Sequence, residues 1–337
     1  MNASPTLSER DRRLIHALQI APRASWSDLG RVLGIDPVTV ARRWARLKSA
    51  GIAWVTAYPS SQDRTLALVE LECRPGQTLD IAHALAQDPE AQTIDLTAGG
   101  RNILVTIGCR NHQELGDYVL ERMSPLASLD GMRTHLLTGI HKDASSWQLR
   151  ALDPGEVVAV QQLAEPKRTT RRGSAQPESE AAIFAELARD GRATAAELSS
   201  RLSLNVDKTR AAMNSILESG RVVVRTEIAR PHSGRPAYAW YFLRTSARSV
   251  DQVLDKLSPL NDVRLLARSV GPYNIIMAMW LRTIGDIQKL EMVIEQKVPE
   301  VRIEDRSLVF RTPKHLGRLL TSTGINTGQM TDTPLWA

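Results

Sequence analysis

The segment DPVTVARRWARL, residues 36–47, decides the fold of the start of this chain. Asp36 is a typical helix cap and Pro37 suits the first helical position, so a helix is predicted to begin here and to end at Gly51. Apolar side chains spaced i, i+4 and i+7 predict its buried stripe: Val40, Trp44 and Leu47. The opposite face then carries three arginines: Arg42, Arg43 and Arg46.

Two helices are predicted upstream of this one. Ser8 is placed to cap ERDRRLIHALQ, residues 9–19, and after a break at Pro22 the segment WSDLGRVLG, residues 26–34, predicts a second helix that ends at a glycine. Three helices in this order, the last two joined by a tight turn, predict a helix-turn-helix. The β-forming segment IAWVTAYPS, residues 52–60, predicts a wing after it.

The chain contains this unit twice. The segment from Leu14 is echoed from Ile183 at one constant offset, with four matched pairs: Leu18 and Leu187, Leu29 and Leu198, Asp36 and Asn205, Gly51 and Gly220. Further on, GGRNILVTIGCR from Gly99 is echoed by GPYNIIMAMWLR from Gly271 at an offset three residues larger. Residues 164–180, rich in proline, serine, threonine and positive charge, predict a linker between the copies.

The second part of each copy predicts the order strand, helix, hairpin, helix, strand. This β-α-β-β-α-β order is that of a ferredoxin-like unit. The predicted fold class is α+β, a tandem repeat of a winged helix-turn-helix and a ferredoxin-like domain. The predicted boundaries are 1–60 and 61–150 for the first copy, 151–176 for the linker, 177–236 and 237–325 for the second copy, and 326–337 for a tail.

Composition restricts the class of protein further. The 337 residues are 42% hydrophobic, enough for buried cores, and 43 Lys and Arg against 37 Asp and Glu leave a net charge of +6, which permits a polyanionic partner. Cys73 and Cys109 stand far apart without a metal-binding pattern, so neither a disulfide framework nor a zinc site is predicted. No signal or membrane-spanning pattern is present, and a cytoplasmic location without a membrane partner is expected.

The opening LSERDRRLIHALQIAPRASWSDLGRVLGIDPVTVARRWARLKSAGI resembles the Lrp/AsnC family of transcription regulators along its whole helix-turn-helix. The hairpins AGGRNILV and VGPYNIIM resemble that family's glycine-x-x-aspartate turn at the effector-binding interface. The resemblance implies double-stranded DNA as partner, an amino acid or related metabolite as effector, and a homodimer or higher homo-oligomer. It implies these effector-binding residues: Gly99, Asn102, Gly271, Tyr273 and Asn274.

Asparagine stands where the family commonly has aspartate. A carboxylate suits the ammonium group of a free amino acid as a charged partner, and the neutral amides of Asn102 and Asn274 do not supply that charge. The effector therefore need not present an ammonium group.

The outward face of the third helix is the predicted reader of DNA, because in a helix-turn-helix that face enters the major groove. Arginine can bind guanine or phosphate there, and the N-terminus of the second helix can hold a phosphate. The candidate contacts in the first copy are Ser25, Ser27, Val38, Thr39, Arg42, Arg43 and Arg46. The alternatives are that the charged face is merely solvated and that Trp26 packs in the core.

The second helix-turn-helix differs in charge. Its positions for the three arginines hold Ala211, Ala212 and Ser215, and residues 177–224 carry six basic against seven acidic side chains, where residues 8–60 carry nine against four. It is either a packing module or a weak DNA contact, for which the candidates are Lys208, Arg210 and Arg235. Arg235, in HSGRP, suits a narrow minor groove, although an ordinary hairpin turn explains the same residues. A homo-oligomer that uses two first-copy helices together is predicted.

Enzymatic motifs are lacking: there is no GxSxG, no phosphate-binding loop and no HExxH. His135 and His141 fall on one face of a predicted strand, which permits a ligand or metal pair, with ordinary core or surface histidines as the alternative. We therefore predict no catalytic residue, metal or cofactor, and a protein that is not an enzyme. Sirohaem decarboxylases are similar in architecture and give the alternative, a tetrapyrrole enzyme, although their typical Tyr/Arg/His cluster lacks its histidine in IDLTAGGRN and ARSVGPYN. A scaffold is the third hypothesis.

Overall fold

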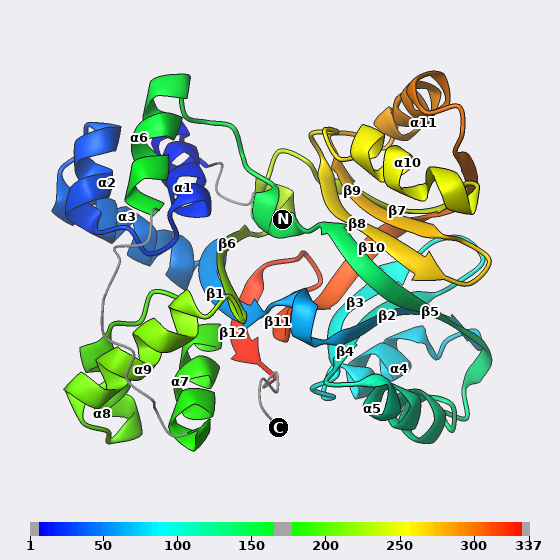
Figure 1. The fold of residues 1–337 in the computed structure, drawn as a ribbon, viewed down its shortest axis with the longest axis horizontal. Helices are drawn as coiled ribbons and strands as arrows, with labels where there is room; N and C mark the ends of the chain where they lie inside the picture. Colours follow the sequence, from blue (N-terminus) through cyan, green and yellow to red (C-terminus); the bar gives the residue numbers. More distant parts are fainter. Residues whose placement is uncertain (1–6, 165–176, 332–337) are drawn as a thin grey trace. The chain divides into compact units, whose positions relative to one another are not determined.

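The computed structural model describes residues 7–164 and 177–331 (Figure 1). These residues form two compact units, and each unit takes segments from both halves of the chain. We call residues 7–62, 148–164 and 177–232 the helical unit, and residues 63–147 and 233–331 the sheet unit. The described helices are all too short or too polar to cross a membrane.

The helical unit contains both helix-turn-helix motifs. The first consists of α1 (Glu9–Ile20), α2 (Trp26–Leu33) and α3 (Pro37–Ser49), followed by strand β1 (Ala53–Pro59). The second consists of α7 (Pro177–Arg189), α8 (Ala195–Leu202) and α9 (Val206–Glu218), followed by strand β6 (Val222–Ile228). The predicted caps are present: Ser8, Ser25 and Asp36 each accept hydrogen bonds from backbone N–H groups of the first helical turn.

The strand predicted to form a wing pairs instead with its counterpart in the second half. Strands β1 and β6 form an antiparallel two-stranded ribbon, with Ala53 opposite Ile228 and Pro59 opposite Val222. Most of β1 is buried, because α7 packs against it while α1 packs against β6. The β-forming residues of 52–60 were correctly predicted as a strand. Their apolar side chains are buried in the ribbon with β6 and do not form an exposed wing.

The predicted linker begins later than residue 151. Residues 154–164 form helix α6 (Pro154–Ala164), whose Val160 is fully buried and whose Glu156 forms an ion pair with Arg13 of α1. Just before it, Nδ1 of His16 accepts the N–H groups of Ala151 and Leu152, both at 3.0 Å. The linker prediction missed this packing because the partners of this helix, α1 and α2, lie more than a hundred residues earlier in the chain; residues 165–176 lie outside the described residues.

The sheet unit repeats one element order in both halves of the chain. The first half gives β2 (Thr65–Cys73), α4 (Thr78–Leu85), β3 (Ala91–Thr97), β4 (Ile103–Cys109), α5 (His112–Asp117) with the π-helical turn η2 (Tyr118–Met123), and β5 (Leu129–Lys142). The second half gives β7 (Ala237–Arg244), α10 (Val250–Leu257), β8 (Val263–Val270), β9 (Ile275–Leu281), α11 (Asp286–Lys297) and β10 (Arg302–His315). The predicted α+β fold class, a helix-turn-helix followed by a ferredoxin-like domain, is confirmed.

The strands of the two halves join into one ring. Their order is β3-β4-β2-β5 in the first half and β8-β9-β7-β10 in the second, and the halves meet where β5 pairs with β8 and where β10 pairs with β3. Because β10 also pairs with β7, the pairings of these eight strands close on themselves. The predicted tail from residue 326 contains a strand: β11 (Arg318–Leu320) and β12 (Asn326–Met330) extend the sheet beyond β10.

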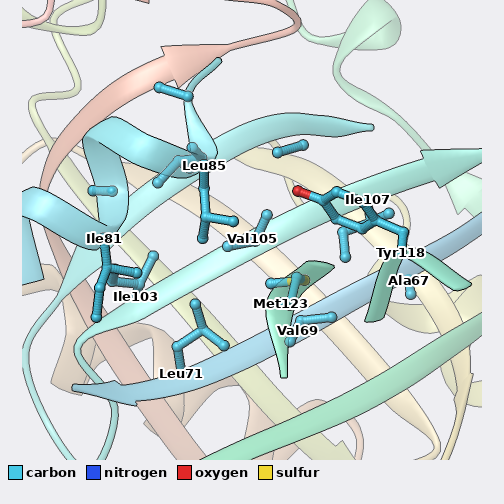
Figure 2. Packing of buried hydrophobic residues seen from close by; sticks show 14 of the residues in the cluster. Ala67, Val69, Leu71, Ile81, Leu85, Ile103, Val105, Ile107, Tyr118 and Met123 are labelled. Atoms are coloured by element: carbon cyan, nitrogen blue, oxygen red, sulfur yellow. The ribbon is translucent and has the colours of Figure 1, made fainter. Parts of the chain in front are cut away.

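Each half has its own apolar core between its helices and its strands. Figure 2 shows the first, where Ile81 and Leu85 of α4 face the inward side chains of β2 and β4, among them Val69 and Val105. The second core is built in the same way, from α10 and α11 against β7, β8 and β9. The opposite side of the strands faces the other half of the chain, and the side chains on it form the seam between the two halves of the sheet unit.

A glycine marks one difference between the two helix-turn-helix turns. Gly34 ends α2 in the left-handed conformation at φ 65°, and at the matching position after α8 stands Ser203 at φ 54°. A side chain in this conformation costs about 1 kcal/mol relative to glycine.

We therefore expect Ser203→Gly to raise the free energy of unfolding by about 0.5–1 kcal/mol, measured by urea denaturation. The reverse change in the first motif, Gly34→Ser, is the matched control and should lower stability by a similar amount. Equal stabilities for all three proteins would contradict this explanation of the two turns.

Candidate functional site

Helix α3 presents an exposed face near its N-terminus. Its side chain Val38 is 75% exposed, Thr39 is half-buried, and Val40, Trp44 and Leu47 form the predicted buried stripe. Arg42 is exposed and forms no hydrogen bond or ion pair with any described residue. It is therefore available to an external anion.

The three arginines of α3 are not equivalent, contrary to the sequence-based expectation. Arg43 and Arg46 bind the buried carboxylate of Asp11 on α1, at 3.1 and 2.8 Å. Burial acts to raise the pKa of Asp11, but the hydrogen bonds from Ser8 and Arg43 and the charge of Arg46 outweigh it and hold the pKa below its ordinary value. Arg46 keeps 62% of its side chain exposed, so it can still reach solvent while Arg43 mainly holds α3 against α1.

The N-terminus of α2 is a capped helix end. Ser25 accepts the N–H of Asp28 and donates its hydroxyl to the carboxylate of the same residue, while Ser27 is exposed. Trp26 lies 6.4 Å from Trp44 between ring centroids, and the guanidinium of Arg192 stacks 3.7 Å above it. These contacts favour the packing interpretation of Trp26.

The second helix-turn-helix presents fewer exposed basic side chains that could bind an anion. Lys208 is exposed at the start of α9, and Arg210 is exposed but paired with Asp207 at 2.8 Å. Ala211 is exposed and Ala212 is buried.

The prediction that Arg235 inserts into a minor groove is wrong. Its side chain is only 10% exposed, pairs with Asp262 and lies 5.9 Å from the ring of Trp147. The turn that contains it leads into β7 of the sheet unit instead of forming the tip of an exposed hairpin.

The two predicted effector hairpins have the same construction. Gly99 and Gly271 adopt φ values of 111° and 141°, which favour glycine. The side-chain oxygen of Asn102 accepts the N–H of Cys73 at 2.6 Å, and that of Asn274 accepts the N–H of Thr245 at 3.0 Å. Asn274 also donates its amide to the carbonyl of Thr245, a bond that an aspartate could not make. Both asparagines therefore fasten a hairpin to the end of the neighbouring strand.

Between the hairpins, at the seam of the two halves, lies a group of side chains that we call the central cluster. It contains four positions from each half, and the offset that relates Gly99 to Gly271 also relates each position to its partner. The four pairs are Glu70 and Phe242, Arg101 and Tyr273, Arg133 and Asp305, and His135 and Ser307. The sequence analysis did not identify most of this cluster. An alignment of the two halves at this offset would have shown that charged residues of the first half are aromatic residues in the second.

Arg101 holds the cluster together. It donates to Glu70 at 2.8 Å and to Ser307 at 2.7 Å, pairs with Asp305, and stacks on Phe242 at 4.3 Å from the ring centroid. Arg101 and Glu70 are both almost fully buried, so each charge depends on the other. All three guanidinium nitrogens of the arginine have partners in the protein.

His135 completes the network beside Arg101. Its Nε2 lies 2.6 Å from Glu70, and its ring lies 5.5 Å from that of Tyr273. Burial acts to raise the pKa of Glu70, yet the hydrogen bond with His135 and the charge of Arg101 lower it overall. The buried Nδ1 of His135 has no partner among the described residues, and a side chain at Gly271 would come within 3.3 Å of it. His141, its predicted companion, lies instead beside Asp255 at 3.5 Å.

A second buried acid, Asp95, lies on β3. It accepts hydrogen bonds from Trp240 at 3.0 Å and Thr312 at 2.6 Å, both from the second half of the chain. Burial raises the pKa of this carboxyl above its ordinary value, although the hydrogen bonds from Thr312, Trp240 and Tyr238 and the charge of His315 oppose the shift. No described cation forms an ion pair with it.

Two segments in the first half of the chain match known domain families. Residues 7–48 match the AsnC-type helix-turn-helix domain, and residues 66–147 match the Lrp/AsnC ligand binding domain. An uncharacterised HTH-type transcriptional regulator of Pyrococcus furiosus is 23% identical over 141 residues, which are 40% of this chain and 95% of the relative. The HTH-type regulator Ptr1 of Methanocaldococcus jannaschii is 25% identical over 145 residues, which are 41% of this chain and 97% of the relative.

A solved structure matches nearly the whole chain. The siroheme decarboxylase NirDL, in complex with an iron-uroporphyrin III analogue, superposes with a TM-score of 0.58 over 92% of this chain and 93% of its own, at 13% identity. At that identity the likeness shows a shared fold. It also corrects one prediction: the sequence-based exclusion of an enzyme is wrong, because the fold that spans both halves of this chain is the fold of an enzyme.

The buried Asp95 generates a pH-dependent prediction. Because its pKa is raised in the folded state, the folded protein favours the protonated form, and the stability it contributes is lost as the pH rises from about 4 through the raised pKa. We expect the free energy of unfolding of the wild type, relative to Asp95→Asn, to fall between pH 4 and pH 7 in urea denaturation. Asp130→Asn, at an exposed carboxylate, is the matched control. A difference that rises with pH would contradict the assignment.

Proposed function

We propose that this protein is a sequence-specific, DNA-binding transcriptional regulator in which two Lrp/AsnC-type units are fused in one chain. The observation that carries the proposal is the exposed guanidinium of Arg42 on α3, which has no partner among the described residues and lies within the segment that matches the AsnC-type helix-turn-helix. The helix is capped by Asp36 and held from behind by its buried stripe, so its outward face is fixed.

In the proposed complex α3 lies in the major groove. Arg42 donates to the acceptors of a guanine, the exposed Val38 contacts a thymine methyl group, and Thr39 bonds a base or a phosphate. Arg46 and Arg43, already paired with Asp11, contribute positive potential near the phosphates. Ser25 and Ser27 at the start of α2 are proposed phosphate contacts, and Lys208 and Arg210 are proposed weaker contacts of the second motif.

The sheet unit is the proposed site of a small-molecule effector, an amino acid or a related metabolite. Since the side-chain oxygens of Asn102 and Asn274 already accept backbone N–H groups, we assign effector recognition mainly to the backbone at Gly99 and Gly271 and to the half-buried Tyr273. We also propose a cytoplasmic location and assembly of the chain into a homodimer or higher oligomer, in line with the family of its domains.

A second candidate function is a decarboxylase of tetrapyrrole carboxylates. Two observations favour it: the likeness to NirDL extends over both halves of the chain, and the central cluster holds a buried imidazole whose Nδ1 is unpartnered among the described residues. In that function His135 and the exposed Arg133 are the groups that would hold or move a proton and bind a carboxylate.

The regulator proposal predicts the effect of Arg42→Ala on binding to the protein's own upstream DNA. Loss of one arginine contact should weaken specific binding about 10- to 100-fold and lower the salt slope by about one unit if the contact is to phosphate. Fluorescence anisotropy at two salt concentrations, with random competitor, measures both. Arg110→Ala, at an exposed arginine of the sheet unit, should leave binding unchanged. Equal affinity for wild type and Arg42→Ala would contradict the assignment of α3 as the reader.

The decarboxylase candidate predicts that siroheme added to the anaerobic protein shifts its visible absorbance and loses carboxyl groups, detected by mass spectrometry. His135→Ala should abolish the reaction while folding, followed by circular dichroism, is retained. A spectrum of siroheme that is unchanged by the protein would eliminate this candidate and leave the regulator proposal standing.

A further inference from the structure

We infer that a single chain recognises an asymmetric DNA duplex, in which α3 specifies the bases of one half-site and α9 occupies the adjacent half-site through its phosphates. The inference rests on the proposed function and adds the form of the DNA partner. It follows from two features of the helical unit: its two motifs are fastened to each other, and of α3 and α9 only α3 carries an exposed arginine with no partner among the described residues.

Reciprocal hydrogen bonds between the ribbon and the helices provide the first fastening. Thr56 on β1 donates its hydroxyl to the carbonyl of Ala188 at the end of α7, at 2.8 Å. In return Thr226 on β6 donates to the carbonyl of Leu18 in α1, at 2.7 Å. All four groups are buried, so water does not compete for these bonds.

Two arginines provide the second fastening, from matching positions in the two motifs. Arg23 donates to the carbonyls of Gly191 and Ala193, in the turn between α7 and α8. Arg192 donates to the carbonyls of Pro22 and Ala24, in the turn between α1 and α2, at 2.6 and 2.8 Å. Each motif thus binds the other through the same residue in the same place, which is the pattern of an approximate two-fold axis.

This arrangement pairs α3 with α9 inside one chain. Dimeric helix-turn-helix proteins place two such helices on half-sites about one helical turn apart, with the protein's two-fold axis on that of the DNA. Here the fastened partner of α3 is α9, and the earlier expectation of two first-copy helices acting together requires a second chain.

The exposed faces of the two helices differ in chemistry. Arg42, which has no partner among the described residues, has Ala211 as its counterpart, and the half-buried Ser215 takes the place of Arg46. In the first turn of α9, Asp207 exposes 80% of its side chain, a carboxylate that repels phosphate, and it also pairs with Arg210. Lys208 remains as an exposed cation with no partner among the described residues, which suits a phosphate contact without base selectivity.

A duplex that fits this unit has one specified half-site and one unspecified half-site. A palindrome gives α9 no second copy of the α3 contacts, because Ala211 and Ser215 stand where α3 has Arg42 and Arg46. The partner is therefore a non-palindromic duplex whose protected length exceeds its specified length.

The test starts from a random-sequence duplex pool, from which the full-length wild-type protein selects its preferred sequence. A hydroxyl-radical footprint and a scan of single base-pair substitutions are then measured on the selected duplex. We expect protection over two adjacent half-sites, with substitutions costing about tenfold or more in one half and less than about twofold in the other.

The outcomes distinguish a failure of this inference from a failure of the regulator proposal. Equal costs in both halves, or protection of one half-site alone, would overturn the inference and leave the regulator proposal intact. Failure to select any sequence would overturn both.

A variant supplies an independent measurement. Ala211→Arg combined with Ser215→Arg restores two of the three arginine positions on the exposed side of α9 and should raise affinity at least tenfold for a duplex with the selected half-site repeated as a palindrome. Ala211→Gln with Ser215→Gln, of similar size and without charge, is the matched control and should gain little. An arginine variant that folds but gains no more than the control would show that α9 does not lie on DNA.

Discussion

The structure depends on the pairing of strands between the two halves of the chain. β5 pairs with β8, β3 with β10, and β1 with β6, so that neither half is complete without the other. Each sheet has an apolar side covered by its own helices and a second side that must be covered by its partner. Because the two halves are covalently linked, their pairing is intramolecular. It does not depend on protein concentration, as the pairing of two separate chains would.

Intramolecular pairing also allows the two sides of the seam to diverge. A symmetric dimer would place two copies of Arg101 and two of Glu70 at its centre, whereas this chain sets one of each against Tyr273 and Phe242. A buried charge is stable only when it is paired and hydrogen-bonded, and Arg101 meets that condition through side chains that belong to the opposite half, Ser307 and Asp305. The same divergence appears in the helical unit, where α3 carries three arginines and α9 carries two alanines and a serine at the matching positions.

Local patterns in the sequence predicted much of this fold. The caps at Ser8, Ser25 and Asp36, the buried stripe of α3 and the βαββαβ order are all present, because caps and periodicity depend on neighbours within a few residues. Predictions failed where a distant partner decided the outcome. Residues 52–60 formed a seam with β6 instead of a wing, residues 154–164 packed on α1 instead of linking domains, and Arg235 was buried against Asp262. The exclusion of an enzyme failed for a related reason, since absent motifs do not describe a site assembled from two halves.

The sequence by itself determined the repeated unit, its helices and strands, the position of the arginines on α3 and their loss from α9. The tertiary structure decided which halves pair, which of the three arginines stays available to a partner, and which side chains meet at the seam. The physical reason is distance along the chain, because a helix cap or a turn glycine acts over a few residues. Asp11 instead pairs with Arg43 and Arg46, more than thirty residues away, and Arg101 binds Ser307, more than two hundred residues away. Such contacts are chosen by the packing of the whole chain, and no local pattern encodes them.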